Sequence, residues 1–381
     1  MSKKITLIVD NIITPYCIAR YNAINHTLGG NLLVWFQSKS DINRHWKEFP
    51  KIHFEYEILA DNPIRLMGSD THTFHRNKNV WKKLDTISSK LDEVIVCGWD
   101  SLTYWQITLF CKIHKVSYAL WSGSTIFEKS WRRTLFYPII FLVVHGATRY
   151  LAYGSRASNF LQSIGADKKK IAIFYNNIDN EHFAKYRKLR KSKEKLHRKK
   201  FCIPERQYVF LYVGQLIPRK GLSDLLAVFK KISQKYATVS LVIVGQGRLQ
   251  NEVKSLQDEL GETRIIHLPH LDYSLLPQLY ACCNCLVLPS HEEVWGLVVN
   301  ESLAAGTPVL TSDMVGSAPD LVKEGITGYT YKSRNLLELE NRMLKMVVSN
   351  FEVSIEGDEI IHATNPKLMA NLHFNSAREN L

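Results

Sequence analysis

Short apolar runs alternate along this chain with longer segments in which apolar residues recur every three or four positions. In the first half, the apolar runs lie at residues 5–9, 32–36, 93–97, 118–121 and 150–153. A second series lies at residues 209–213, 240–244, 265–268, 285–288 and 308–311. Apolar runs of this length that alternate with helical patterns predict β–α–β units, and therefore a parallel sheet for each series. We expect an α/β protein with two Rossmann-like domains facing across a crevice, in which ligands bind at the carboxyl ends of the strands.

The length of 381 residues agrees with about two domains. Between the two series, residues 184–206 carry few large apolar side chains and many lysines and arginines. A run of this kind predicts a solvated linker or helix face, or else a dedicated nucleic-acid or membrane patch, although it lacks the interleaved aromatic residues that stack on bases. The predicted division is residues 1–185, a basic linker at 186–205, a second domain at 206–350 and a tail at 351–381. We expect a helix in the tail, over residues 366–380, to cross back onto the first domain.

The charge balance favours an anionic partner. Lys and Arg outnumber Asp and Glu by 49 to 36, a net charge of +13, which suits a phosphorylated ligand, a nucleic acid or an acidic membrane surface. The seven cysteines are odd in number and lie mostly in apolar stretches, which favours a reducing compartment and a cytoplasmic protein. The apolar run before Asp10 is too short for a signal-peptide core and predicts a first strand.

The most apolar stretch of the chain, residues 135–144, follows Trp131, Arg132 and Arg133 and contains Pro138. It is too short to span a bilayer of about 30 Å as a helix. It predicts either a buried helix or an interfacial segment whose arginines meet anionic headgroups.

The segment with the most candidate chemistry is residues 287–311, VLPSHEEVWGLVVNESLAAGTPVLT. A strand leads into a polar loop and a helix that starts near Trp295 or Gly296, so Glu293 in the loop and Glu301 in an early turn can both face the crevice. Free backbone N–H groups at that helix start form a site for phosphate oxygens. Two glutamates eight positions apart are, taken alone, also typical of an ordinary surface.

The segment VGQLIPRKG, residues 213–221, likewise joins a strand to an amphipathic helix. Arg219 and Lys220 in this loop suit a diphosphate, since arginine offers a fork of donors and lysine a compact charge. Read alone, they are surface charges.

Other motifs are incomplete. Gly245 and Gly247 lack the third glycine of a dinucleotide fingerprint, and no phosphate-loop motif is present. Cys282 and Cys285 form a CxxC without the further ligands of a zinc site, so we interpret them as buried structural residues. Neither a metalloprotease motif nor a Ser-His-Asp signal is apparent, and we expect neither a metal nor a cofactor.

Together these segments resemble the retaining family-4 glycosyltransferases of the GT-B fold, the glycosyl transferases group 1. The resemblance rests on VGQLIPRKG, LVIVGQGRL, LPHLDYSLLPQLYACCNCLVLPS and the E-x7-E stretch through GTPVL, and it covers about residues 5–331. In the first half, ITPYCIARYNAI, VCGWDSLTYW, ALWSGST, AYGSRASNFLQSIGADKKKI and NNIDNEHF are also similar to this family.

The resemblance implies roles for individual residues. Glu301 would bind the ribose hydroxyls of the donor nucleotide, Glu293 would contact the donor sugar, and Lys220 with Arg219 would neutralise the diphosphate. The remaining implied donor-binding residues are Gly214, Gln215, Trp295, Gly296, Leu297, His270 and Leu271. The implied acceptor-side residues are Pro15, Tyr16, Ser122 and Ser124.

The chain departs from the family pattern at three positions. Gln215 stands where an arginine is common, which leaves diphosphate neutralisation to Arg219 and Lys220. Gly123 stands where a glutamate is usual, and Asn284 where an aspartate is common.

The resemblance implies a metal-independent, retaining glycosyltransferase that uses a UDP- or GDP-linked sugar. Its acceptor would be lipid-linked or a polysaccharide, in bacterial surface glycan synthesis such as that of lipopolysaccharide, at the inner face of the cytoplasmic membrane. We expect an anionic membrane surface as a partner and no nucleic acid. Two alternatives remain, a nucleotide-sugar epimerase of the same fold and a non-catalytic binder of anionic membranes or nucleic acid.

Overall fold

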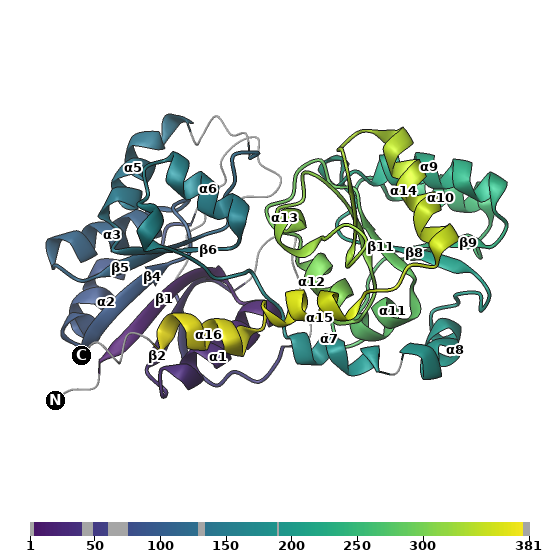
Figure 1. Ribbon diagram of the computed structural model, residues 1–381. Helices are drawn as coiled ribbons and strands as arrows, with labels where there is room; N and C mark the ends of the chain where they lie inside the picture. The colour runs from purple at the N-terminus through teal and green to yellow at the C-terminus, as the bar shows by residue number, and fades with distance from the viewer. Residues whose placement is uncertain (1–3, 40–48, 60–74, 129–133, 189, 376–381) are drawn as a thin grey trace. The chain divides into compact units, whose positions relative to one another are not determined.

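A computed structural model describes residues 4–39, 49–59, 75–128, 134–188 and 190–375. The chain forms two compact units, which are described separately here. The first unit contains residues 1–176 and 366–381, and the second contains residues 177–365 (Figure 1). Trp131, Arg132 and Arg133, which the sequence analysis linked to an interfacial segment, lie outside the described residues, as does the end of the predicted C-terminal helix beyond residue 375.

The first unit is built on a seven-stranded parallel sheet of order β3-β2-β1-β4-β5-β6-β7. Its strands are β1 (Ile5–Ile12), β2 (Leu32–Ser38), β3 (Glu55–Ile58), β4 (Leu91–Val96), β5 (Tyr118–Ser122), β6 (Arg149–Ala152) and β7 (Ile171–Ile173). Its helices are α1 (Pro15–Thr27), α2 (Val80–Ile87), α3 (Leu102–Ile113), α5 (Tyr137–Gly146), α6 (Ser155–Ser163) and α16 (Pro366–Phe374), with the short turns η1 (Ser88–Lys90) and η2 (Lys168–Lys170). Apolar cores lie on both faces of this sheet.

The second unit has a six-stranded parallel sheet of order β10-β9-β8-β11-β12-β13. Its strands are β8 (Tyr208–Val213), β9 (Val239–Val244), β10 (Ile265–Leu268), β11 (Cys285–Leu288), β12 (Val309–Ser312) and β13 (Gly328–Tyr331). Its helices are α7 (Asn180–Arg187), α8 (Arg190–Lys200), α9 (Leu222–Lys235), α10 (Gln250–Leu260), α11 (Leu276–Cys282), α12 (Leu297–Ala304), α13 (Ala318–Leu321), α14 (Leu336–Ser349) and α15 (Ile355–His362), with the turn η3 (Pro218–Lys220).

Two Rossmann-like α/β units confirm the predicted fold class, and the predicted strand runs all lie within or beside strands of the two sheets. The last helix, α16, packs on α1 within the first unit, where Met369, Ala370 and Phe374 enter the apolar core. The strands that the pattern did not predict, β3, β7 and β13, are only three or four residues long.

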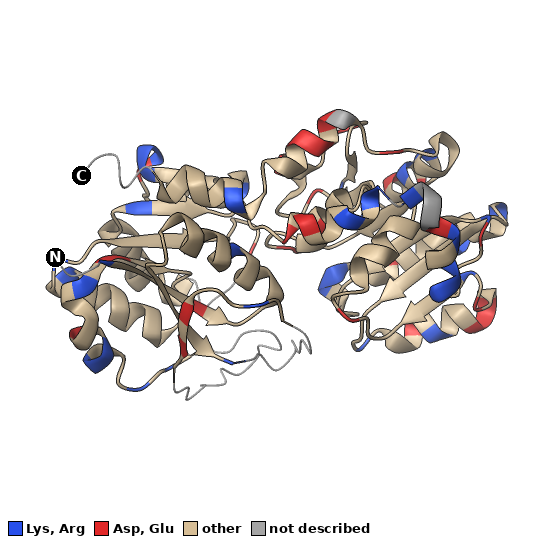
Figure 2. Cartoon of the chain, turned by 90° about the horizontal axis from the view of Figure 1, so that it is seen from below, with Lys and Arg blue, Asp and Glu red and all other residues tan. Residues whose placement is uncertain are grey.

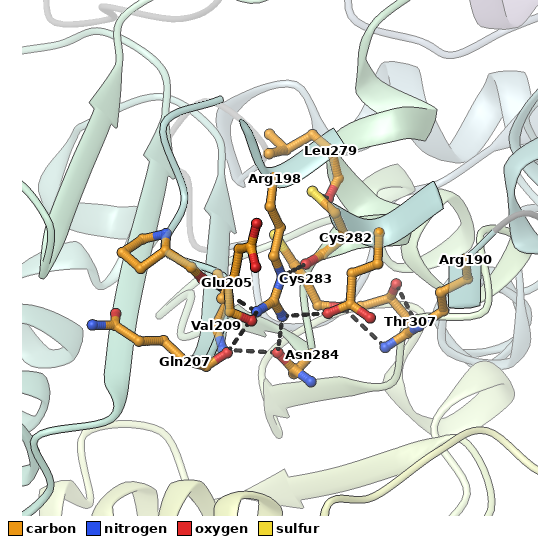
Figure 3. Close-up of polar contacts among 12 residues, drawn as sticks. Arg190, Arg198, Glu205, Gln207, Val209, Leu279, Cys282, Cys283, Asn284 and Thr307 are labelled. Carbon is orange, nitrogen blue, oxygen red and sulfur yellow. Dashed lines mark hydrogen bonds and ion pairs between the residues drawn. The ribbon is translucent and has the colours of Figure 1, made fainter. Parts of the chain in front are cut away.

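Most of the segment 186–205, predicted as a basic linker or helix face, forms the helix α8, and it lies inside the second unit, which begins at residue 177. Arg198 of α8 is buried, and its guanidinium donates to the backbone carbonyls of Cys282 (3.1 Å), Glu205 (2.8 Å) and Gln207 (2.9 Å) (Figure 3). It also donates to Oδ1 of Asn284 at 2.9 Å. One arginine fork therefore binds the end of α11 and the chain before β8, which a count of charges along the sequence does not reveal.

In the view of Figure 2, Lys and Arg positions occur on helices of both units, and acidic positions lie between them on the second unit. None of the seven cysteines forms a disulfide, and Cys282 and Cys285 are buried as expected.

Candidate functional site

The strand order of the second sheet identifies its ligand-binding edge. From β8 the chain adds β9 and β10 on one side, and it then returns to add β11, β12 and β13 on the other. In open parallel sheets, ligands bind outside the carboxyl ends of the strands, where the order reverses. The loops that follow the neighbouring strands β8 and β11 are therefore the candidate site, and these loops carry Lys220 and Glu293.

Lys220 and Glu293 are in direct contact. The ammonium group of Lys220, at the end of η3, donates to Oε2 of Glu293, and both side chains are only 14% exposed. Gly221 after Lys220 has φ +70° and begins α9, and a β-carbon there would lie 2.0 Å from the carbonyl oxygen of Pro289. The β8–α9 loop thus packs directly against the loop after β11, which explains how residues 73 positions apart meet.

Arg219 lies in the same pair of loops but makes different contacts. Its Nη1 donates to the carbonyl of Glu292 at 3.4 Å, and its own carbonyl accepts from the backbone N–H of His291 at 2.8 Å. Arg219 is partly exposed, so its guanidinium retains donor capacity toward the solvent side of the loop.

Trp295, Gly296 and Leu297 form the start of α12. Gly296 has φ +90°, a conformation that glycine adopts readily, and it immediately precedes the helix. The Trp295 indole is buried, and its Nε1 donates to Oδ1 of Asn300 at 2.9 Å. This tryptophan therefore anchors the loop, while the first backbone N–H groups of the eight-residue helix lie at the carboxyl edge of the sheet.

Glu301 lies on α12, as predicted, but its side chain is 0% exposed rather than open to solvent. The hydroxyl of Tyr280, on α11, donates to Oε2 of Glu301 at 2.6 Å. Burial, together with the Glu301 charge, raises the pKa of Tyr273 well above its usual range. The carboxylate is thus held in a polar, tyrosine-lined setting within the unit.

Gly214 and Gln215 follow β8, in a loop that packs against the loop carrying Gly245 and Gly247. A β-carbon on Gly245 would lie 1.9 Å from the carbonyl oxygen of Gly214, and one on Gly247 would lie 2.4 Å from that of Leu216. These glycines therefore permit two loops to pack backbone against backbone. The Tyr212 hydroxyl donates to the carbonyl of Gln215 at 2.8 Å.

His270 and Leu271 lie on the loop after β10, at the same edge of the sheet but two strands away from β8. His270 is exposed, and its Nε2 lies 3.2 Å from Oδ1 of Asp272. The structure therefore does not bring these two residues into contact with Lys220 or Glu293.

Other residues, which the sequence pattern did not predict, hold this site in place. Tyr280 binds Glu301, and Asn300 binds Trp295. His291, beside Glu293, lies 3.2 Å from the Ser333 hydroxyl, and burial lowers its pKa. Asn300 directly precedes the predicted site residue Glu301, and this position was the available signal. For Tyr280 the sequence offers no signal beyond its place in an apolar helical pattern.

The predicted acceptor-side residues lie in the first unit. Pro15 and Tyr16 begin α1, and Thr14 caps this helix by accepting from the backbone N–H of Cys17 at 3.0 Å. The Ser122 hydroxyl, at the end of β5, accepts from the backbone N–H of Ser124 at 3.2 Å. Both groups follow the carboxyl ends of strands in one sheet, separated by β4.

A buried polar cluster that the sequence analysis did not predict lies at the same edge. Asp10, at the carboxyl end of β1, accepts from the Tyr21 hydroxyl at 2.5 Å. Burial raises the pKa of Asp10 above its usual range. Arg20 lies 5.0 Å from the centre of the Trp121 ring and donates to Oδ1 of Asn176 at 2.5 Å. This cluster ties β1, α1 and β5 together beneath the predicted acceptor residues.

Among the residues that the structure describes, no three His, Cys, Asp or Glu side chains are grouped so as to hold a metal ion. Across the same residues, every helix is too short or too polar to cross a bilayer.

Comparison with known proteins points to one family for the second unit. Residues 193–352 match the model of the family "Glycosyl transferases group 1". An uncharacterized glycosyltransferase of Methanocaldococcus jannaschii is 29% identical over 169 residues, which are 44% of this chain and 42% of that protein. A glycogen synthase of Mycobacterium tuberculosis is 35% identical over 133 residues, 34% of this chain and 31% of that protein. The chain therefore aligns with less than half the length of these curated relatives.

The likeness in structure extends over both units. The Anabaena protein HepE, crystallised with UDP and glucose, has a TM-score of 0.66 and 18% identity, and the match covers 98% of each chain. At this identity the comparison establishes the fold, a pair of parallel-sheet α/β units.

Proposed function

We propose that this protein is a glycosyltransferase that moves a sugar from a nucleoside diphosphate sugar to a hydroxyl acceptor. The observation that carries the proposal is the contact of Lys220 with Glu293 beside the start of α12, at the edge where the strand order of the second sheet reverses. The family match over residues 193–352 and the UDP bound to the Anabaena protein support the same reading.

The donor would bind with its diphosphate at the β8–α9 loop and the start of α12. Lys220 supplies a compact cation, Arg219 supplies a fork of donors, and the first N–H groups of α12 add a positive dipole end. Gly214 and Gln215 offer backbone groups beside them. In this proposal Glu301 binds the ribose, which requires that the donor uncover its carboxylate, and residues 270 and 271 line the base pocket.

Transfer breaks the bond between the anomeric carbon and the diphosphate oxygen, so negative charge grows on the leaving group. Cations and helix N–H groups that are already in place stabilise this charge, and the proposed reaction needs no metal for that purpose. Glu293 contacts both Lys220 and, in the proposal, the donor sugar. It therefore neutralises Lys220 until a diphosphate arrives, after which Lys220 exchanges a carboxylate partner for a phosphate partner.

We propose retention of the anomeric configuration. The acceptor oxygen then approaches the face from which the diphosphate leaves, and the departing diphosphate oxygen takes the acceptor proton. No separate carboxylate nucleophile is required. The acceptor would be bound near Pro15, Tyr16, Ser122 and Ser124, and it would be lipid-linked or a growing polysaccharide at the inner face of a bacterial cytoplasmic membrane.

The test is release of free nucleoside diphosphate from UDP- and GDP-linked sugars, with and without lipid-linked glycan acceptors. The proposal predicts release that depends on an acceptor and a product with the donor's anomeric configuration, unchanged by a chelator. Release of nucleoside diphosphate with water as the only acceptor would contradict the proposal. Interconversion of the nucleotide sugars without an acceptor would also contradict it, in favour of an epimerase.

A variant makes the test specific to the site. Glu301→Gln should raise the KM for the donor by roughly tenfold, because a lost charged hydrogen bond is worth about 1.5–3 kcal/mol. Glu259→Gln, which removes a carboxylate from an exposed ion pair with Lys230 in the same unit, is the matched control and should leave KM unchanged.

A further inference from the structure

Large exposed apolar side chains concentrate on one side of the first unit. Fourteen such side chains are exposed in the described part of the chain, and six of them lie on α3, on α5 or in the turn just before α5. These six are Leu109, Ile113, Leu135, Tyr137, Phe141 and Leu142. We call them the α3–α5 face.

The two helices form one continuous surface, because they lie side by side (Figure 1). The ring centres of Trp105 on α3 and Phe136 before α5 are 5.3 Å apart, and Nζ of Lys112 donates to the carbonyl of Leu142 at 3.3 Å. Only the inner side of α5 packs in the core, through Ile140, Val143 and Val144. A surface helix usually exposes polar residues, so an apolar outer side marks an interaction surface.

Lysines lie next to this face. Residues 101–170 contain ten Lys and Arg but only two Asp and Glu, a net charge of +8 for this segment. In the described part, Lys112 and Lys115 lie at the end of α3, and the exposed residues 168–170 are all lysine. The loop before those lysines reaches α5, since a β-carbon on Gly165 would lie 2.5 Å from the His145 ring.

We propose that the α3–α5 face docks on an anionic lipid bilayer. Apolar side chains on one side of a helix, with lysines at its border, match a surface in which acyl chains lie beneath negative headgroups. Neither helix is long enough to cross the bilayer, so both lie along its surface. The inference rests on the proposed function only in that a lipid-linked acceptor would be held at the same membrane.

The position of α5 fits this role. The ring of Phe136, just before α5, lies 5.3 Å from that of Trp105 near the start of α3, and α3 follows the carboxyl end of β4, so α5 begins at the edge of the sheet that carries Ser122 and Ser124. An acceptor anchored in the bilayer beside the start of α5 would therefore be close to the predicted acceptor residues.

The test is flotation of the full-length protein with phosphatidylcholine vesicles that contain either no phosphatidylglycerol or 40% of it, roughly the anionic content that makes lysine attraction strong. Wild-type protein should float with the anionic vesicles and weakly with the neutral ones. Phe141→Glu with Leu142→Glu places two charges on the face at positions 42% and 58% exposed, where they do not disturb the core. This variant should bind about tenfold less, because two apolar side chains no longer enter the acyl region.

The matched control is Leu337→Glu with Val348→Glu, which adds the same charges at exposed apolar positions on α14 of the second unit. It should float like the wild type. Equal binding by both variants, or no binding of the wild type to anionic vesicles, would overturn the proposal. A dimer in lipid-free solution that disappears in the Phe141 and Leu142 variant would also overturn it, in favour of a second copy as the occupant.

A nucleotide-binding measurement on the same preparations separates this inference from the proposed function. Retained stabilisation by a nucleoside diphosphate with no vesicle binding would contradict only the membrane surface. Vesicle binding without any nucleotide effect would contradict only the transferase.

Discussion

The contact between Lys220 and Glu293 is the most consequential pair of side chains in the second unit. The two charges are mostly shielded from solvent and satisfy each other. A diphosphate that binds Lys220 must compete with the Glu293 carboxylate. In the proposed mechanism, donor binding therefore moves both side chains out of their mutual contact.

We predict that Glu293→Gln binds free nucleoside diphosphate several-fold more tightly, because a competing carboxylate beside Lys220 has been removed. The same change should lower kcat at least tenfold, because the contact that the proposed mechanism gives Glu293 with the donor sugar is lost. Titration calorimetry and steady-state kinetics on one preparation measure the two effects. Weaker nucleotide binding in this variant would show that Glu293 contributes to nucleotide binding rather than opposing it.

Gly245 and Gly261 differ in how much space a side chain would have at their positions. Gly245→Ala should destabilise the protein by about 2–4 kcal/mol, since its β-carbon would meet the Gly214 carbonyl at 1.9 Å. Gly261→Ala is the control, because Gly261 also has positive φ but no atom within 4 Å of the added carbon, and it should cost only about 1 kcal/mol. Urea unfolding measures both values. Similar losses would indicate that backbone conformation, not close packing, explains the glycine at 245.

Gly123 shows how a departure from a family pattern can have a local cause. A β-carbon at this position would lie 2.2 Å from the Tyr153 ring. The glutamate usual in the resembling family therefore cannot occupy this site unless Tyr153 moves, so the glycine and the tyrosine fit as a pair.

At the scale of elements, two arginines of α8, Arg190 and the buried Arg198, donate hydrogen bonds to the rest of the second unit. We predict that Arg198→Met destabilises the second unit by about 3 kcal/mol, since buried carbonyls and Asn284 lose their donors. Lys199→Ala, at the exposed neighbouring position, should change the free energy of unfolding by less than about 0.5 kcal/mol. Chemical denaturation provides both numbers, and equal stability of the two variants would contradict a buried role for Arg198.

Helix α16 gives the first unit a pH-dependent contact. Burial lowers the pKa of His373, and the nearby Arg149 charge lowers it further, while Nε2 lies 3.0 Å from the Ile173 carbonyl. The unfolded chain, with a histidine pKa near 6.5, therefore binds a proton before the folded protein does. The contribution of neutral His373 to the free energy of unfolding should be fully present above pH about 6.5. It should fall as the pH drops from there toward the lowered pKa of His373 in the folded protein.

His373→Gln should reduce the loss of melting temperature between pH 7.5 and 5.5, a range chosen to span roughly one unit around the histidine value. The exposed His270→Gln serves as the control and should leave the slope unchanged. An identical slope in His373→Gln and the wild type would exclude this histidine as the cause.

For the whole molecule, the pattern of apolar runs was sufficient for the fold class, because long buried strands of parallel sheets are apolar on both faces. The short strand β3 escaped detection since its sequence, EYEI, is mostly exposed at the edge of the sheet. The charge density at 186–205 predicted a linker or helix face at the boundary between units, but the second unit begins at residue 177, and the buried Arg198 makes α8 part of that unit.

The sequence predicts which residues of the candidate site lie at the edge of the sheet, but not which of them touch. Spacing within a strand–loop–helix segment placed Lys220 and Glu293 at the carboxyl edge, but only the close approach of Gly221 to Pro289 brings them into contact. The burial of Glu301 beneath Tyr280 depends on how α11 packs on α12, and no local pattern encodes that packing.

The most direct test of a nucleoside diphosphate site between β8 and β11 is thermal unfolding with UDP, GDP and ADP, for the wild type, Lys220→Met and Lys230→Met. At about 100 times its dissociation constant, a nucleotide should add roughly 2.7 kcal/mol and raise the melting temperature by several degrees. We predict such a rise with one nucleotide in the wild type and in Lys230→Met, and its loss in Lys220→Met. No rise with any nucleotide, or the same rise in Lys220→Met, would contradict the site.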